Sequence, residues 1–208
     1  WRQMGLDGWG YDDVLPYFKK SEGFDEGADD YHGGDGPLGV SSPEIADPLF
    51  QAFADAGQEA GYPFTEDYNG AEQEGFCRFQ FTTRNGKRSS AAVAFLHPAS
   101  TRNNLTIATE AHVTRILFAG QKAIGIEYLQ GGKLVQVLAA REVIVSGGAY
   151  NSPQTLLLSG IGPADHLRAM GIEPIIDLKG VGRNLQDHPS NVLQYSRIGK
   201  SPFHENMR

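Results

Sequence analysis

Apolar side chains recur at helical spacing in one clear segment of the chain. In residues 46–63, ADPLFQAFADAGQEAGYP, they lie three or four positions apart and form one face of a helix. Asp47 can cap the first turn, Pro48 suits that turn, and Gly61 can end the helix. We therefore expect a helix between Asp47 and Gly61 whose apolar face belongs to the core: Leu49, Phe50, Phe53, Ala56 and Ala60.

The pattern of the first 42 residues is less regular. The stretch GWGYDDVLPYFKKSEGF, residues 8–24, predicts a turn that leads into a short helix with Asp12 or Asp13 near its N-terminus. Residues 24–42 are rich in glycine, aspartate and serine, which is typical of an exposed loop.

From residue 104 onward the pattern changes to that of strands. Three β-rich segments are separated by Ala119-Gly120-Gln121 and by Gly131-Gly132, which are short enough for hairpin connections. This arrangement predicts an antiparallel meander. It ends in the wholly apolar Val143-Ile144-Val145, a pattern typical of a strand buried on both faces of a parallel sheet.

The most informative segment of the chain follows this apolar run: GGAYNSPQTLLLSGIG, residues 147–162. We interpret it as a glycine turn, a helix with Ser152 as its N-cap and Pro153 as its first residue, and a glycine stop. Because Gly147 and Gly148 lack a Cβ atom, a ligand could approach them closely at the carboxyl end of the strand. Alternatively, the two glycines merely permit a tight turn, and the pattern alone favours that interpretation.

Composition narrows the class of protein. The chain has 208 residues with a net charge of −7 and no basic stripe, which argues against nucleic-acid binding. Its apolar runs are too short for a transmembrane segment. The single cysteine, Cys77, excludes an internal disulfide and favours a cytoplasmic location. Because the chain starts at Trp1 and stops soon after a strand-like segment, we expect it to be an excerpt of a longer protein.

Other polar residues predict little chemistry. Lys87 and Arg88, between an Asn-Gly turn and the predicted helix SAAVAFLHP, could form an anion site, but a solvated turn is the favoured interpretation. The pair Asp187-His188 looks like a catalytic dyad, yet adjacent side chains rarely face each other, so we assign His188 a structural role. The six histidines show no metal-ligand spacing, and we expect no metal site.

The exact residues of several motifs are similar to those of one enzyme family. GGAYNSPQTLLLSGIGP closely resembles the second signature of the glucose-methanol-choline (GMC) oxidoreductases, with Thr155 at a position that is usually aliphatic. Three further segments resemble the same family in the same order, and the best fit is to its choline dehydrogenase or alcohol dehydrogenase branch: GWGYDDVLPYFKKSE, NGKRSSAAVAFLHPASTRNNLTIATEAHVTRILF and GVGRNLQDHP.

This resemblance implies a mixed α/β fold that forms part of a two-domain flavoprotein. Residues 1–37 and 76–188 would belong to a Rossmann-like FAD-binding domain that includes the β-meander. Residues 38–75 and 189–208 would belong to the substrate domain, the latter as its truncated start.

The resemblance also implies the cofactor and the candidate site. FAD would be bound with its adenine near the backbone of Val113, and Gly147, Gly148 and Ala149 are the next candidate contacts. No catalytic residue is assigned, because the family's catalytic histidine would lie beyond Arg208.

The implied reaction is oxidation of a primary alcohol to an aldehyde, with hydride transfer to FAD and electron transfer to a quinone-type acceptor or oxygen. A cytoplasmic enzyme, or one peripheral at the membrane, would fit. The alternatives are a relative of the hydroxynitrile lyases and a catalytically inert fragment.

Overall fold

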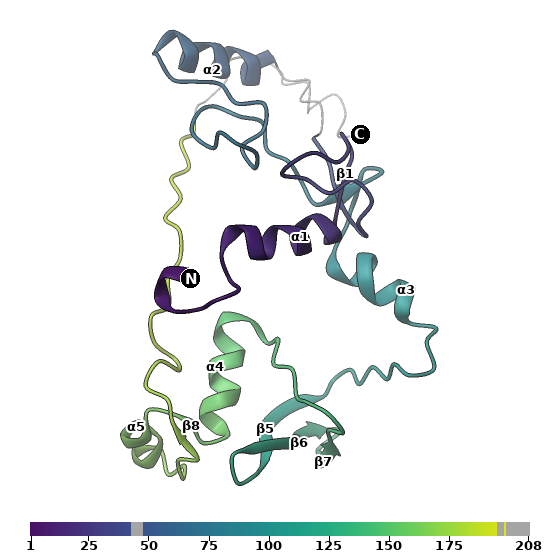
Figure 1. Cartoon of the computed structure of the whole chain (residues 1–208), viewed down its shortest axis with the longest axis vertical. Coiled ribbons are helices and arrows are strands. Elements are labelled where there is room, and N and C mark those ends of the chain that lie inside the picture. Colours follow the sequence, from purple (N-terminus) through teal and green to yellow (C-terminus); the bar gives the residue numbers. More distant parts are fainter. Residues whose placement is uncertain (43–47, 195–197, 199–208) are drawn as a thin grey trace. The chain divides into compact units, whose positions relative to one another are not determined.

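The computed structural model of the chain describes residues 1–42, 48–194 and 198, and has a mixed α/β fold, as predicted (Figure 1). The described residues form two compact units, one covering Trp1–Leu105 and the other Thr106–Gln194. This division does not follow the four predicted domain segments, which remain a prediction about a larger protein. The segment predicted as the start of a substrate domain, 189–208, lies largely outside the described residues.

The first unit consists of short elements joined by long connections. Its strands pair as a parallel β1–β2 and an antiparallel β3–β4, and a π-helical segment, Ala92–Leu96, leads directly into α3. The elements are a 3₁₀ turn at Arg2–Met4, α1 (Tyr11–Ser21), β1 (Glu22–Phe24), β2 (Leu38–Val40), α2 (Pro48–Glu59), β3 (Thr83–Arg84), β4 (Lys87–Arg88) and α3 (His97–Ala99).

The predicted helix near the start of the chain is confirmed as α1. Its N-cap is Gly10, whose backbone N–H donates to the Asp13 carboxylate at 2.9 Å. The exposed loop predicted for residues 24–42 is wrong. The segment ends in the parallel strand β2, and His32 within it is only 2% exposed. The physical reason is Gly33, which lies so close to the Lys19 carbonyl of α1 that no side chain would fit there.

The predicted helix α2 is confirmed, whereas the prediction that its five apolar residues form the core is wrong. Leu49 and Phe53 are 51% and 59% exposed, and the buried positions of α2 are Ala54 and Gly57. The reason is that the Phe76 ring packs directly over Gly57, so the smallest residues of the helix face the protein. The predicted cap, Asp47, lies outside the described residues.

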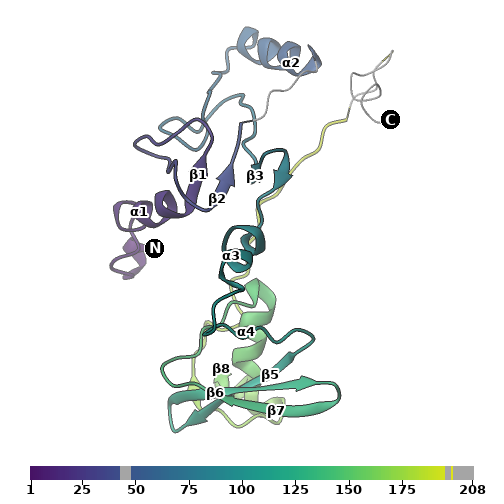
Figure 2. The same ribbon diagram turned by 90° about the vertical axis from the view of Figure 1, so that its right-hand side faces the viewer.

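The second unit contains the meander (Figure 2). Three antiparallel strands in the order β5–β6–β7 confirm the prediction, and β8 and β9 form a separate parallel pair. The elements are β5 (His112–Ala119), β6 (Lys122–Gln130), β7 (Lys133–Leu138), α4 (Gly148–Leu158), β8 (Ile161–Gly162), α5 (Ala164–Ala169) and β9 (Ile176–Asp177). Among the described residues of this unit, Leu167 of α5 is the most buried apolar side chain, at 1% exposed.

Two predictions for the connection between β7 and α4 are wrong. Val143-Ile144-Val145 is not a strand, and Ile144 is 77% exposed, because a buried parallel strand needs neighbouring strands and none within the described residues pairs with it. The helix α4 begins at Gly148 with Gly147 as its N-cap, so Ser152 is not the cap and Pro153 lies inside the helix. Pro153 removes one amide donor from the helix, and α4 packs against β5.

Candidate functional site

A cavity of about 670 Å³ lies within the second unit, between the meander and α4. Its walls come from the first residues of β5, the middle of β6, the end of β7, the connection 142–147, and one side of α4. Val113 and Gly147, two of the four predicted site residues, both line this cavity. Gly148 and Ala149 follow Gly147 in the chain but are not among the lining residues. The fold therefore brings together two residues that are 34 positions apart in the sequence.

The two glycines have different local roles. A Cβ atom on Gly147 would lie 3.0 Å from the Cβ of Asn151, so this glycine allows the turn to pack closely on the start of α4. Gly148 has a φ of +81°, in the left-handed region that favours glycine, and has no atom within 4 Å of an added Cβ. The simple requirement for a tight turn thus accounts for both glycines, while Gly147 also borders the cavity.

Val113 precedes a β-bulge in β5. It pairs with Tyr128 of β6, whereas Arg115, two residues further on, pairs with Glu127. Thr114 is consequently the extra residue, and such bulges bend a strand and redirect its side chains. The bulge therefore directly follows a residue that lines the cavity, Val113.

Glu127 lies opposite the bulge and is held by three neighbouring side chains. Arg115 donates from Nε to Oε1 at 3.0 Å and from Nη2 to Oε2 at 3.1 Å. Gln136 donates to Oε2 at 3.0 Å, and the Thr114 hydroxyl donates to Oε1 at 3.1 Å. The Arg115 hydrogen bonds are the main reason why the pKa of Glu127 falls to about 2, and those from Gln136 and Thr114 act in the same direction.

Sequence reasoning missed Glu127. The available signal was the hairpin itself: the Gly120-Gln121 turn places residues of β5 and β6 opposite each other, and opposite charges at cross-strand positions indicate a pair. The bulge shifts the register by one residue, so the partner of Arg115 could not be read from spacing alone.

A buried serine attaches α4 to the sheet. The Ser159 hydroxyl donates to the Thr155 carbonyl at 2.5 Å and accepts the backbone N–H of Ile116 at 2.8 Å. Ser159 is 6% exposed and follows the last residue of α4. Thr155 and Ile116 line the cavity, so these bonds hold two of its walls together.

The predicted basic turn lies in the first unit, where it borders a second cavity of about 580 Å³. Lys87 and Arg88 form β4 after the Asn85-Gly86 turn, and both are exposed. Arg84 also lines this cavity and donates to the Gly36 carbonyl at 2.9 Å. The exposure of Lys87 and Arg88 supports the interpretation as a solvated turn.

The remaining candidate residues show no catalytic arrangement. The Asp187 carboxylate accepts the backbone N–H of His188 at 2.8 Å, a local turn contact and not a bond to the imidazole. Cys77 is half-buried and has a free thiol. In the part of the chain that the structure describes, no group of three metal-ligating side chains occurs. Across the same residues, no helix combines the length and the apolar character needed to cross a bilayer.

Comparison with known proteins defines the class to which this fold and cavity belong. Residues 1–190 match the GMC oxidoreductase family. The chain belongs to that family, which confirms the resemblance inferred from its motifs.

Individual relatives narrow the comparison. The chain is 52% identical over 194 residues to the mitochondrial choline dehydrogenase of Homo sapiens, covering 93% of this chain and 33% of the relative. It is 50% identical over 201 residues to the oxygen-dependent choline dehydrogenase of Pseudomonas putida, covering 94% of this chain and 36% of the relative. An FAD-dependent oxidoreductase from Chaetomium thermophilum has a similar solved structure, with a TM-score of 0.84 and 33% identity over 90% of this chain and 35% of that one. The chain thus spans about a third of the length of the relatives that it matches.

Proposed function

We propose that the protein containing these residues is an FAD-dependent oxidoreductase that oxidises a primary alcohol to an aldehyde, with choline as the first candidate substrate. Membership of the GMC family and about 50% identity to choline dehydrogenases support this proposal. Within the chain, the observation that carries it is the shared cavity of Val113 and Gly147, the residues that the family resemblance associates with the adenosine half of FAD.

The cavity fits part of such a cofactor. Its walls are largely aliphatic, with Val113, Ile116 and Ile126 among them, and such surfaces suit a flat heteroaromatic base. Asn151 and Gln154 of α4 add side-chain amides that can donate and accept hydrogen bonds at the same walls. We assign the adenine to the backbone of Val113 and to Gly147, and propose Gly148 and Ala149 as neighbouring contacts outside the cavity itself.

The chain's own residues would bind and orient the cofactor. FAD, when bound, supplies the hydride acceptor of the oxidation. Val113 and the Gly147 turn would position its adenosine half, and the apolar walls would exclude water from it. The base that removes the alcohol proton is assigned by resemblance to a histidine beyond Arg208, so none of the residues described above takes that role.

The electron acceptor is proposed to be oxygen or a quinone-type compound. The name of the Pseudomonas putida relative, an oxygen-dependent choline dehydrogenase, supports oxygen. A cytoplasmic location, or one peripheral at the membrane, stays a prediction.

Anaerobic reduction tests the proposal in the complete protein that contains these residues. We expect choline, or another primary alcohol, to bleach the absorbance of bound FAD in the absence of oxygen. One aldehyde molecule should form for each FAD that is reduced. The matched control is the same protein treated with ethyltrimethylammonium, the analogue of choline in which a hydrogen atom replaces the hydroxyl group. Bound FAD that no alcohol reduces would contradict the oxidation, and release of cyanide from a hydroxynitrile would favour the lyase alternative.

A second proposal concerns the chain by itself. We propose that a polypeptide of only these 208 residues is catalytically inert. The exposed side chains of Ile144 and Val145 support this, because exposed apolar side chains next to a binding cavity are typical of a surface that other residues cover. Alcohol oxidation by the isolated, FAD-treated chain would contradict the proposal.

A further inference from the structure

The strand that leads to the proposed adenosine site is not regular. Between Val113 and Arg115, β5 contains one residue more than the facing part of β6. An extra residue in one strand leaves backbone groups without their usual ladder partners, so a bulge needs other contacts to hold one conformation. The side chains around Thr114 supply those contacts.

The Thr114 hydroxyl lies within hydrogen-bond distance of two groups of Glu127. The Thr114 hydroxyl lies 3.1 Å from the backbone carbonyl of Glu127 and 3.1 Å from its carboxylate. Both groups are acceptors and the hydroxyl has one hydrogen, so Thr114 shares its single hydrogen bond between the backbone and the charged group of the facing residue.

The Glu127 carboxylate is in turn fixed from both neighbouring strands. Its side chain is 9% exposed, while that of Arg115 is 52% exposed, so the carboxylate is the buried member of the pair. Arg115 of β5 and Gln136 of β7 occupy both of its oxygens. A carboxylate with this many donors has little freedom to rotate, and a single conformation of the bulge follows.

We propose that Glu127 is a positioning residue for the adenosine half of the cofactor: through Thr114 it holds the bulge that sets the Val113 backbone at the cavity. Glu127 is not among the residues that line the cavity, so it acts through its neighbours without touching the ligand. This inference rests on the proposed function, because it assigns a supporting residue to the same site.

Ligand affinity in the FAD-free complete protein tests the inference. The variants are Glu127→Gln, which keeps the size but removes the charge, and Thr114→Val, which keeps the shape but removes the hydroxyl. The probes are FAD, ADP for the adenosine half, and FMN for the flavin half. For Glu127→Gln we expect affinity for ADP and FAD to fall about tenfold, with unchanged affinity for FMN.

The Thr114→Val variant is the gentler change and tests the connection itself. We expect it to weaken ADP binding in the same direction, and the double variant to be little worse than Glu127→Gln alone, because both changes break one connected network. Glu173→Gln serves as the matched control, since Glu173 is an exposed carboxylate of the same unit outside the network. We expect it to bind all three probes as the unmodified protein does.

The outcomes separate positioning from simple stability. All affinities are measured well below the unfolding temperature of each variant, so that a loss of stability alone leaves them unchanged. Normal ADP affinity in both Glu127→Gln and Thr114→Val, despite lower unfolding temperatures, would overturn the inference and leave the proposed function intact. An unmodified protein that binds neither FAD nor ADP would overturn the proposed function and the inference together.

Discussion

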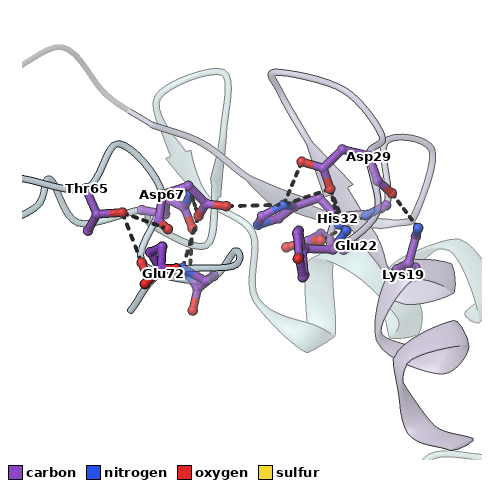
Figure 3. A network of polar contacts seen from close by, with 11 residues as sticks. Lys19, Glu22, Asp29, His32, Thr65, Asp67 and Glu72 are labelled. Atoms are coloured by element: carbon purple, nitrogen blue, oxygen red, sulfur yellow. Dashed lines mark hydrogen bonds and ion pairs between the residues drawn. The ribbon is translucent and has the colours of Figure 1, made fainter. Parts of the chain in front are cut away.

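Each of the two units contains a cluster of charged side chains around a buried polar residue, Glu127 in the second unit and His32 in the first. The two clusters differ in the groups that hydrogen-bond to the carboxylates. In the second unit Glu127 lies in β6, the middle strand of the meander, and its partners come from β5, which contains the bulge, and from β7. In the first unit His32 lies in the long connection between β1 and β2, and the two carboxylates beside it, Asp29 and Asp67, also come from connecting segments (Figure 3). Side-chain donors therefore dominate around Glu127, and backbone groups matter more around His32.

The His32 cluster joins segments that are far apart in the chain. Nδ1 of His32 lies 3.2 Å from Oδ1 of Asp29 and 3.7 Å from Oδ2 of Asp67. The imidazole also stacks on Phe24, with 4.5 Å between ring centroids. Asp67 is held by Gln80, whose amide donates to it at 2.9 Å. His32 thus connects the segment after β1 with the segment that follows α2.

Backbone amides hold the acidic member of this cluster. The backbone N–H groups of Tyr31 and His32 donate to Oδ1 of Asp29 at 2.7 and 2.6 Å. The His32 amide is the main reason why the pKa of Asp29 is lowered from its ordinary value. In the sheet, the strand register places side-chain donors of neighbouring strands beside the carboxylate. In the loop, backbone N–H groups two and three residues further along the chain donate to the carboxylate.

The largest effect is expected from the glycine that closes the loop. In Gly33→Ala the added methyl group would overlap the Lys19 carbonyl oxygen, a backbone atom of α1 that cannot move alone. We expect the free energy of unfolding of the first unit to fall by about 3 kcal/mol, the upper part of the range for overpacking. Urea denaturation measures it.

A matched glycine provides the control for that change. Gly180→Ala adds the same methyl group where nothing lies within 4 Å, and we expect almost no change in stability. Equal stability of Gly33→Ala and Gly180→Ala would mean that close backbone packing does not shape the His32 loop.

A smaller effect is expected from removing the ring nitrogens of His32. His32→Phe keeps an aromatic ring beside Phe24 but leaves Asp29 and Asp67 without their imidazole partner. Since these carboxylates are partly exposed, 53% and 31%, water can replace the lost contacts, and we expect a loss of about 1 kcal/mol. Thermal unfolding of His32→Phe and His32→Ala separates ring packing from hydrogen bonding. A phenylalanine variant more stable than the unmodified protein would show that the nitrogens do not stabilise the loop.

The smallest effect concerns acid stability of the Glu127 cluster. Because the pKa of Glu127 is lowered to about 2 from the ordinary 4.5, its ionised form stabilises the fold above pH 4.5. This contribution is lost as the pH falls from about 4.5 towards about 2. We expect the protection of the β5 amides against hydrogen exchange, relative to the intrinsic rate at each pH, to fall over that range in the unmodified protein, and Glu127→Gln to show a weaker pH dependence. Identical pH profiles would contradict the role of the charge.

Local patterns predicted the elements well where neighbours along the chain decide the conformation. The helices α1 and α2, the three-stranded meander and the Asn85-Gly86 turn follow from short-range spacing and turn chemistry. The glycine pair at 147–148 was also recognised as a turn, although the helix begins four residues before the predicted cap at Ser152. The motifs further identified the family, because exact residues in four ordered segments carry more information than periodicity.

Burial and the supporting contacts depended on segments that are distant in the sequence. The buried positions of α2 are Ala54 and Gly57, with the Phe76 ring over Gly57, whereas Leu49 and Phe53 are exposed. The helical spacing of apolar residues does not predict that choice. Val143–Val145 looks like a buried strand, but a strand is buried only when other strands pair with it. Arg115 faces Glu127 because of a one-residue bulge, and Val113 and Gly147 line one cavity only because α4 packs against β5. Spacing along the chain encodes local conformation, whereas pairing and packing are set by which surfaces meet in the folded protein.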